Sequence, residues 1–184
     1  MAILTRSEFA SFARSKAGYT GLKGVVNQTR TFSKASSITS IFLSHAHTDK
    51  EVVEQAKYFF ENLGISVYVD WADETMPQKP NSTTANRIKT QIATQNDKFV
   101  LLATNEAVAS KWCNWEVGIG DSFKLPTKKM ALLPLADNSG SWNGNEYLQI
   151  YPRIEKNSTQ NGGESYFVWY PDQTWETLDS WLRK

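Results

Sequence analysis

KFVLLATNEAVASKWCNWE, residues 98–116, joins a continuous apolar run to a helical pattern. The run from Lys98 to Ala103 has the length and composition of a strand buried on both faces, as in a parallel sheet. The segment after it predicts a helix from Glu106 to Phe123, in one or two pieces. Because positions four apart share a helix face, Trp112 and Glu116 should project together beside the end of the strand. Such a pair could hold a flat cationic ring and the sugar attached to it.

Strands and helices alternate on both sides of this stretch. Further strands are predicted at residues 38–44, 65–69 and 130–135, and further helices at 48–63 and 83–95. The first of these helices opens with Thr48-Asp49-Lys50-Glu51, which reads as a capping box, and Gly64 closes it. Between 71 and 82 lies a proline-containing loop, long enough to suggest a function. This alternation predicts a parallel central sheet with helices on both faces.

The two ends of the chain differ in character from this core. We expect a short amphipathic helix at residues 4–16, capped by Thr5 or Ser7, and then a linker, so that 1–37 forms an N-terminal helix and linker. Residues 38–184 form the main domain, with a motif-bearing core at 38–135 and a C-terminal extension at 136–184. In that extension, residues 151–154 and 165–170 should pair as a hairpin. A closing helix at 174–183 should place Trp175, Leu178 and Leu182 on one side.

Composition excludes several classes of function. The 184 residues are 40% hydrophobic, and 20 basic against 19 acidic residues leave a net charge of +1. No run of charge suggests nucleic acid or an anionic membrane as a partner, and no stretch approaches the roughly 20 apolar residues of a membrane span. The single cysteine, Cys113, cannot form an intrachain disulfide and is expected to be a buried structural thiol. We therefore expect a cytoplasmic protein.

Three features should meet at the carboxyl edge of the sheet, where ligands bind in such folds. They are Ser44-His45-Ala46-His47, the loop from Asp70 to Pro80, and the Trp112/Glu116 pair. Two histidines so close together suggest a metal, but no cysteine or acidic cluster at ligand spacing accompanies them, so we expect no metal site.

The residues at these positions resemble the successive boxes of a bacterial Toll/interleukin-1 receptor (TIR) domain. The boxes are Ile41-Phe42-Leu43-Ser44 followed by Asp49, Val67-Tyr68-Val69-Asp70, and Ser110-Lys111-Trp112-Cys113 with Glu116. The resemblance covers about residues 38–135, and Trp-Cys-x-x-Glu is its most specific part. It implies a flavodoxin-like fold in which Glu116 is the catalytic residue for cleaving the nicotinamide–ribose bond of NAD.

The chain is similar in particular to the stand-alone TIR subunits of antiphage defence systems such as Thoeris. That resemblance implies an NAD glycohydrolase or ADP-ribosyl cyclase whose ADP-ribose-derived, possibly cyclic product signals to a separate effector protein. It also implies self-association for activity. NAD would be consumed as a substrate, with no separate cofactor, which fits the absence of Gly-x-Gly-x-x-Gly and phosphate-loop motifs.

The chemistry of the bond supports Glu116 independently. Losing nicotinamide leaves positive charge on the ribose, an oxocarbenium-like state that a carboxylate stabilises. Trp112 could lie against the pyridinium ring or the adenine, and Ser44 and His45 could donate hydrogen bonds to phosphate or ribose. Trp71 and Asp73, in the loop, complete the predicted substrate-binding set.

Two alternatives remain open at the level of sequence. One is a non-enzymatic TIR scaffold in which the loop from Asp70 to Pro80 mediates self-assembly and Glu116 is structural. The other is an enzyme like the nucleoside deoxyribosyltransferases, which share a layered sheet and a glutamate that attacks ribose.

Overall fold

Eight strands form one sheet in a computed structural model that describes residues 3–17, 38–73, 81–137, 139–158 and 164–184. Seven of them follow the order β3-β2-β4-β5-β6-β7-β8, and β1 pairs with β5. Their bounds are β1 Leu4–Thr5, β2 Ser40–Ser44, β3 Ser66–Tyr68, β4 Lys98–Ala103, β5 Met130–Ala136, β6 Arg153–Ser158, β7 Glu164–Trp169 and β8 Trp175–Thr177. Pairing is parallel from β3 through to β6 and antiparallel from β6 to β8. The predicted parallel α/β sheet and the C-terminal hairpin are therefore confirmed.

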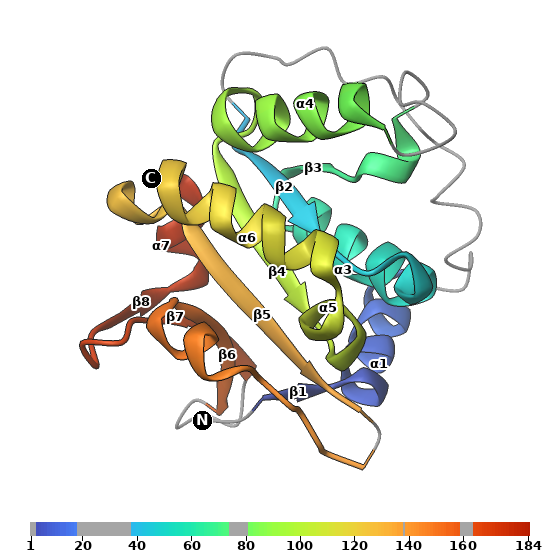
Figure 1. Cartoon of the computed structure of the whole chain (residues 1–184). Helices are drawn as coiled ribbons and strands as arrows, with labels where there is room; N and C mark the ends of the chain where they lie inside the picture. The colour runs from blue at the N-terminus through green and yellow to red at the C-terminus, as the bar shows by residue number, and fades with distance from the viewer. Residues whose placement is uncertain (1–2, 18–37, 74–80, 138, 159–163) are drawn as a thin grey trace.

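Helices cover both faces of the sheet (Figure 1). One face is packed by α1 (Arg6–Ala17), α3 (Lys50–Asn62) and α7 (Leu178–Arg183), with core side chains such as Phe9, Phe59 and Trp181. The other is packed by α4 (Ser82–Thr90), the π-helical turn Gln91–Gln95, α5 (Asn105–Ala109) and α6 (Lys111–Phe123). Buried strand residues alternate between the two cores, as the two-residue period of a strand requires.

The predicted helix after β4 forms as two pieces, α5 and α6, which meet at Ser110. Ser110 has extended backbone angles, and its hydroxyl accepts a hydrogen bond from the Cys113 amide at 3.3 Å, so it caps α6. Further along, Gly120 lets α6 pack closely on β4. A Cβ atom at this position would lie 3.0 Å from the Phe99 ring. These two residues fix where α6, and therefore Glu116, sits over the sheet.

The N-terminal helix is part of the same packed structure. Thr5 and Glu8 exchange hydrogen bonds between side chain and backbone, which confirms Thr5 as the cap. Phe9 is fully buried, with its ring centroid 5.7 Å from that of Phe59 on α3. The predicted linker lies almost entirely outside the described residues.

Two predictions about element ends are wrong. Residues 174–183 do not form one helix, because Trp175 belongs to β8, pairs with Trp169 and is 54% exposed, while the helix begins at Leu178. The predicted capping box at residues 48–51 does not form either. The Asp49 side chain instead accepts hydrogen bonds from Arg6 at 3.0 Å and Thr104 at 2.5 Å.

The loop after β3 begins with a 3-10 turn, Asp70–Ala72, and residues 74–80 of it lie outside the described structure. Within the described ranges, none of the helices combines the length and the apolar composition that crossing a bilayer requires.

Candidate active site

The candidate site lies where the strand order reverses. β2 is flanked by β3 and β4, and the connections leaving β2 and β4 run to opposite faces of the sheet, since α3 packs on one face and α6 on the other. The carboxyl ends of two such neighbouring strands border a crevice in open α/β sheets. Ser44 is the last residue of β2, and Thr104 follows β4. Sequence reasoning predicted this edge, and the structure places Ser44, Trp112 and Glu116 together at it.

Glu116 is the centre of the cluster. It projects from α6 and is 3% exposed, and one of its carboxyl oxygens, Oε2, accepts a hydrogen bond from Ser44 Oγ at 2.5 Å. The Trp112 side chain lies near this carboxyl group and favours its ionised form. Burial raises the pKa of Glu116 to about 8, an effect that nearby Asp70 increases and that Ser44 and Trp112 oppose. At neutral pH Glu116 is therefore mostly protonated.

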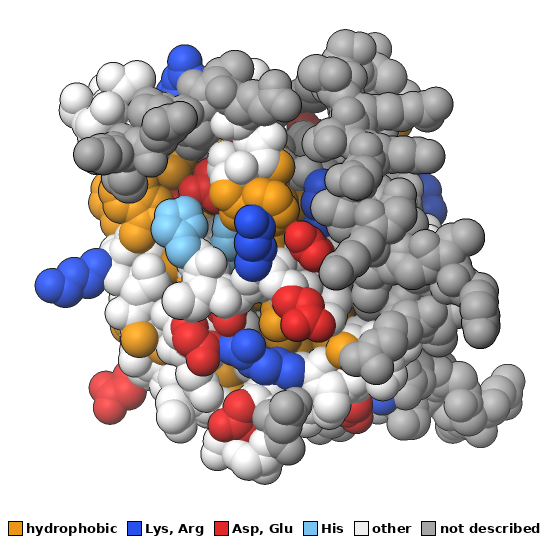
Figure 2. All heavy atoms as spheres, turned by 90° about the vertical axis from the view of Figure 1, so that its right-hand side faces the viewer, with side chains coloured by type: hydrophobic (Ala, Val, Ile, Leu, Met, Phe, Trp, Pro, Cys, Tyr) orange, Lys and Arg blue, Asp and Glu red, His pale blue; other side chains and the backbone are white. Residues whose placement is uncertain are grey.

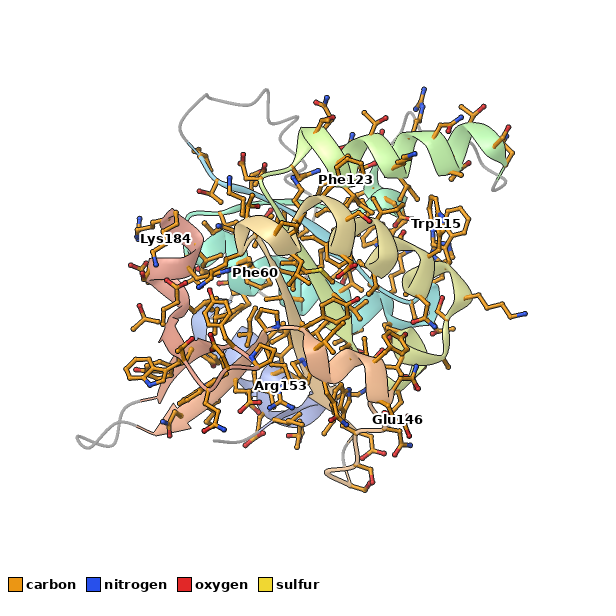
Figure 3. All side chains as sticks on the ribbon, turned by 60° about the vertical axis from the view of Figure 1, so that its left-hand side comes forward. Phe60, Trp115, Phe123, Glu146, Arg153 and Lys184 are labelled. Atoms are coloured by element: carbon orange, nitrogen blue, oxygen red, sulfur yellow. The ribbon has the colours of Figure 1, made fainter. Side chains whose placement is uncertain are left out.

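Trp112 and Trp115 form an aromatic pair on α6. Their ring centroids lie 5.0 Å apart with planes tilted by 45°. Trp112 is half-buried and packs against the core on the α6 face, whereas Trp115 is 39% exposed and lies at the periphery of the molecule (Figure 3). Trp112 thus presents a ring beside the carboxyl group.

His45 follows Ser44 directly and is buried. Its Nδ1 lies 2.9 Å from the Leu43 carbonyl oxygen, and its Nε2 lies 3.4 Å from Asp70 Oδ1. Burial lowers the pKa of His45, so the ring is neutral at pH 7. His47 is exposed on the 3-10 turn after it, and the two imidazoles lie side by side on the face shown in Figure 2.

The two predicted residues of the loop lie on the β3 side of the cluster. Asp73 accepts a hydrogen bond from the Tyr68 hydroxyl at 2.8 Å, and burial together with this bond raises the pKa of Tyr68. Trp71 is 36% exposed, and the ammonium group of Lys50 lies 5.1 Å from the centre of its ring. The structure therefore brings Ser44 and Trp112 into contact with Glu116, and it places Trp71 and Asp73 against Lys50 and Tyr68.

Two neighbours of the site were not among the predicted site residues. Asp70 lies against His45 and acts electrostatically on Glu116. The buried Cys113 thiol interacts with Ser44 and Ser110, and burial raises its pKa to about 11, which makes it an unreactive thiol as expected. A carboxylate directly after a buried strand is the sequence signal that marks Asp70. Nothing in the sequence indicated that Cys113 would face Ser44.

A separate cavity of about 660 Å³ lies elsewhere, lined by residues that include Trp142, Arg153 and Trp169. It shares no lining residue with the Glu116 cluster, and it holds no carboxylate among its lining residues. Its chemistry is therefore different from that of the candidate active site.

Comparison with known proteins gives two findings. Residues 41–155 match the family model described as TIR domain. The chain is also 31% identical over 170 residues to a probable 3′ cyclic ADP-D-ribose synthase, ThsB', of Bacillus cereus. That alignment covers 88% of this chain and 84% of the relative.

Proposed function

Because this chain belongs to the TIR domain family, we propose that it cleaves the nicotinamide–ribose bond of NAD and releases nicotinamide and an ADP-ribose-derived signalling nucleotide, in antiphage defence. The observation that carries the proposal is the buried Glu116 carboxyl group at the reversal of strand order, hydrogen-bonded by Ser44. The product class follows the relative's printed activity. A cyclic ADP-ribose is the expected form.

The geometry suggests how Glu116 would act. NAD carries a positive charge on its pyridinium ring, and a cation beside Glu116 would favour the ionised carboxylate that burial otherwise opposes. The carboxylate would then stabilise the oxocarbenium-like ribose as neutral nicotinamide departs. Ser44 donates a hydrogen bond to it and so holds its orientation, and Trp112 beside it also favours the ionised form. The nicotinamide ring is cationic while it is bonded to ribose and leaves as a neutral molecule. NAD itself therefore supplies a good leaving group, so the reaction needs no separate cofactor.

Further parts of the proposal concern the setting of the reaction. We propose that the protein acts in the cytoplasm, where NAD is available, that it self-associates for activity, and that a separate effector protein reads the product. Exposed Trp71 and Trp115, beside the site, are suited to a contact between copies because aromatic side chains are enriched at interfaces.

The test is product analysis by chromatography with mass detection. Wild-type protein, Glu116→Gln and the control Glu146→Gln, an exposed glutamate away from the cluster, are incubated with NAD over a range of protein concentrations and with a crowding agent. We expect release of nicotinamide by the wild type and the control, and a rate at least about 100-fold lower for Glu116→Gln, the scale on which removing one stabilising group acts. The mass of the partner product separates ADP-ribose from its cyclic form. If wild-type protein consumes no NAD in any of these conditions, the scaffold hypothesis replaces this one.

A further inference from the structure

A second cluster of chemically active side chains adjoins Glu116, formed by His45, His47 and Asp70. Each offers one ligand atom, and these atoms all lie within 4.8 Å of one another. The two histidines come from the segment after β2 and the aspartate from the segment after β3, so neighbouring parallel strands bring the three together. Histidine side chains are seen in pale blue on the face shown in Figure 2, where His47 is exposed and His45 is buried beneath the surface.

His45 is arranged as a metal ligand. A carbonyl oxygen can only accept, so the contact with Leu43 places the ring proton on Nδ1 and leaves a lone pair on Nε2. That nitrogen is buried and has no hydrogen-bond partner among the residues that the structure describes, and the His45 side chain is 3% exposed. A carbonyl group that accepts from the other ring nitrogen and so fixes the tautomer is a regular feature of metal-binding histidines.

The partner that His45 faces strengthens this interpretation. Its Nε2 lone pair points into a space shared with the Asp70 carboxylate, 3.4 Å away. Two electron-rich groups at this distance repel one another unless a cation lies between them. Zinc–nitrogen bonds of about 2.0–2.1 Å in a tetrahedral site place neighbouring ligand atoms about 3.3–3.4 Å apart. The separation between His45 Nε2 and Asp70 Oδ1 therefore fits one edge of such a site, and exposed His47 can turn to supply a third ligand.

The set of ligands selects the kind of ion. Two imidazole nitrogens and one carboxylate suit zinc and its transition-metal neighbours, whereas magnesium and calcium prefer oxygen ligands. Three protein ligands would leave the fourth position for water, as in open zinc sites.

We propose that His45, His47 and Asp70 bind a divalent transition-metal ion of the zinc class, and that the bound ion represses the neighbouring Glu116 site. Repression follows from charge, because His45 is covalently next to Ser44, which donates to Glu116. A doubly positive ion placed there opposes entry of the cationic pyridinium ring. Binding stands independently of the NAD reaction, whereas repression rests on the proposed function.

Metal binding is measured first, without any enzyme assay, on tag-free protein. The chain contains only two histidines, so binding that depends on histidine reports on this cluster. Zinc is titrated in competition with a chromophoric chelator, and cobalt absorption reports tetrahedral geometry. We expect one ion per chain in the wild type, and affinity at least about tenfold weaker in His47→Gln and Asp70→Asn, the lower end of the effect of disturbing a metal shell. The control Asp179→Asn, an exposed carboxylate on α7, and Cys113→Ala should bind as the wild type does.

The outcomes separate the two parts of the proposal. Wild-type protein that binds no zinc, or binding that both His47→Gln and Asp70→Asn retain, overturns the site. Loss of binding in Cys113→Ala with retention in His47→Gln assigns the metal to the thiol and also overturns it. Where binding is present, zinc should slow nicotinamide release by the wild type and should no longer do so, at the same concentration, in His47→Gln. Equal rates with and without bound zinc in the wild type overturn repression.

Discussion

Glu116 is a carboxyl group whose burial makes its ionisation costly to the stability of the fold. A glutamate side chain normally ionises in water, but here it is 3% exposed, and burial outweighs the two neighbours that favour its charged form. Ser44 holds the carboxyl group without fully replacing water. The residue is therefore held in the state that a cationic substrate would convert to the carboxylate.

The raised pKa predicts that removing the charge stabilises the fold. Between its ordinary value of 4.5 and about 8, Glu116 holds its proton in the folded chain and loses it in the unfolded chain. Its contribution to the free energy of unfolding therefore falls as pH rises through this window. We expect Glu116→Gln to have the larger free energy of unfolding at pH 8, by on the order of 4 kcal/mol, and nearly none of this gain at pH 4.5.

Denaturant unfolding of Glu116→Gln and wild type at several pH values measures this difference. Glu146→Gln, which removes an exposed carboxylate, corrects for general effects of charge. A difference between Glu116→Gln and wild type that stays constant with pH would contradict a proton held by Glu116.

At the scale of elements, α6 is positioned by small residues at both of its ends. Ser110 starts the helix with a side-chain cap, and Gly120 allows its last turns to approach the Phe99 ring. Glu116 lies between them on the same helix, so its distance from Ser44 depends on how closely α6 packs on β4.

Two glycines of α6 provide a matched pair of substitutions. Gly118 is exposed with nothing within 4 Å of an added Cβ, so Gly118→Ala should stabilise the fold by about 0.5–1 kcal/mol through helix propensity. Gly120→Ala gains the same propensity but places its Cβ 3.0 Å from the fully buried Phe99 ring, so we expect a net loss of about 1–3 kcal/mol. Thermal unfolding of both variants measures the contrast. A Gly120→Ala protein as stable as Gly118→Ala would show that α6 does not need the close approach.

Elements were predictable from sequence where local pattern alone decides them. β4 was predicted with its observed bounds, because a short continuous apolar run flanked by polar residues is typical of a strand buried on both faces. Trp175 was misassigned because its spacing to Leu178 and Leu182 also fits a helix. In the structure Trp175 pairs with Trp169 on β7, and this pairing between two strands is not visible in the local sequence pattern. The capping box predicted at residues 48–51 was wrong because the Asp49 side chain instead bonds Arg6 and Thr104, which are distant in sequence.

The candidate site was predictable to the same extent. Ser44, Trp112 and Glu116 were predicted from the order of the strands and the spacing of the helix, and they meet as expected. The sequence predicted that the segments of His45 and Asp70 meet at this edge. It did not predict the contact between the two side chains, which depends on how the segments after β2 and β3 turn. The sequence showed no acidic cluster at ligand spacing beside the two histidines, whereas the fold brings Asp70 close enough to form a candidate ligand set with them.

At the scale of the whole molecule, the first described helix contributes to the same core as the sheet. Phe9 is fully buried against Phe59, and Arg6 pairs with buried Asp49 and with Glu106 at the edge that carries the site. The N-terminal residues therefore support the structure that positions the loop after β2.

Shortening Phe9 should consequently destabilise the whole fold. We expect Phe9→Ala to lower the free energy of unfolding by about 3–5 kcal/mol, the usual cost of removing a buried aromatic ring. Phe123→Ala, which shortens a phenylalanine that is 49% exposed, should change it by less than about 0.5 kcal/mol. Denaturant unfolding monitored by tryptophan fluorescence gives both values. If the two variants unfold alike, α1 is an appendage and not a part of the core.

The pairing of β1 with β5 has a consequence for how the chain is made. Leu4 lies opposite Leu135, so the two partners are separated by most of the sequence. During synthesis the first strand leaves the ribosome well before its partner exists, and at about 5–20 residues per second the wait lasts some seconds. Phe9 on the helix after it stays without its full set of neighbours for the same interval. The nascent chain therefore presents an apolar surface that chaperones can recognise until β5 emerges and closes the fold.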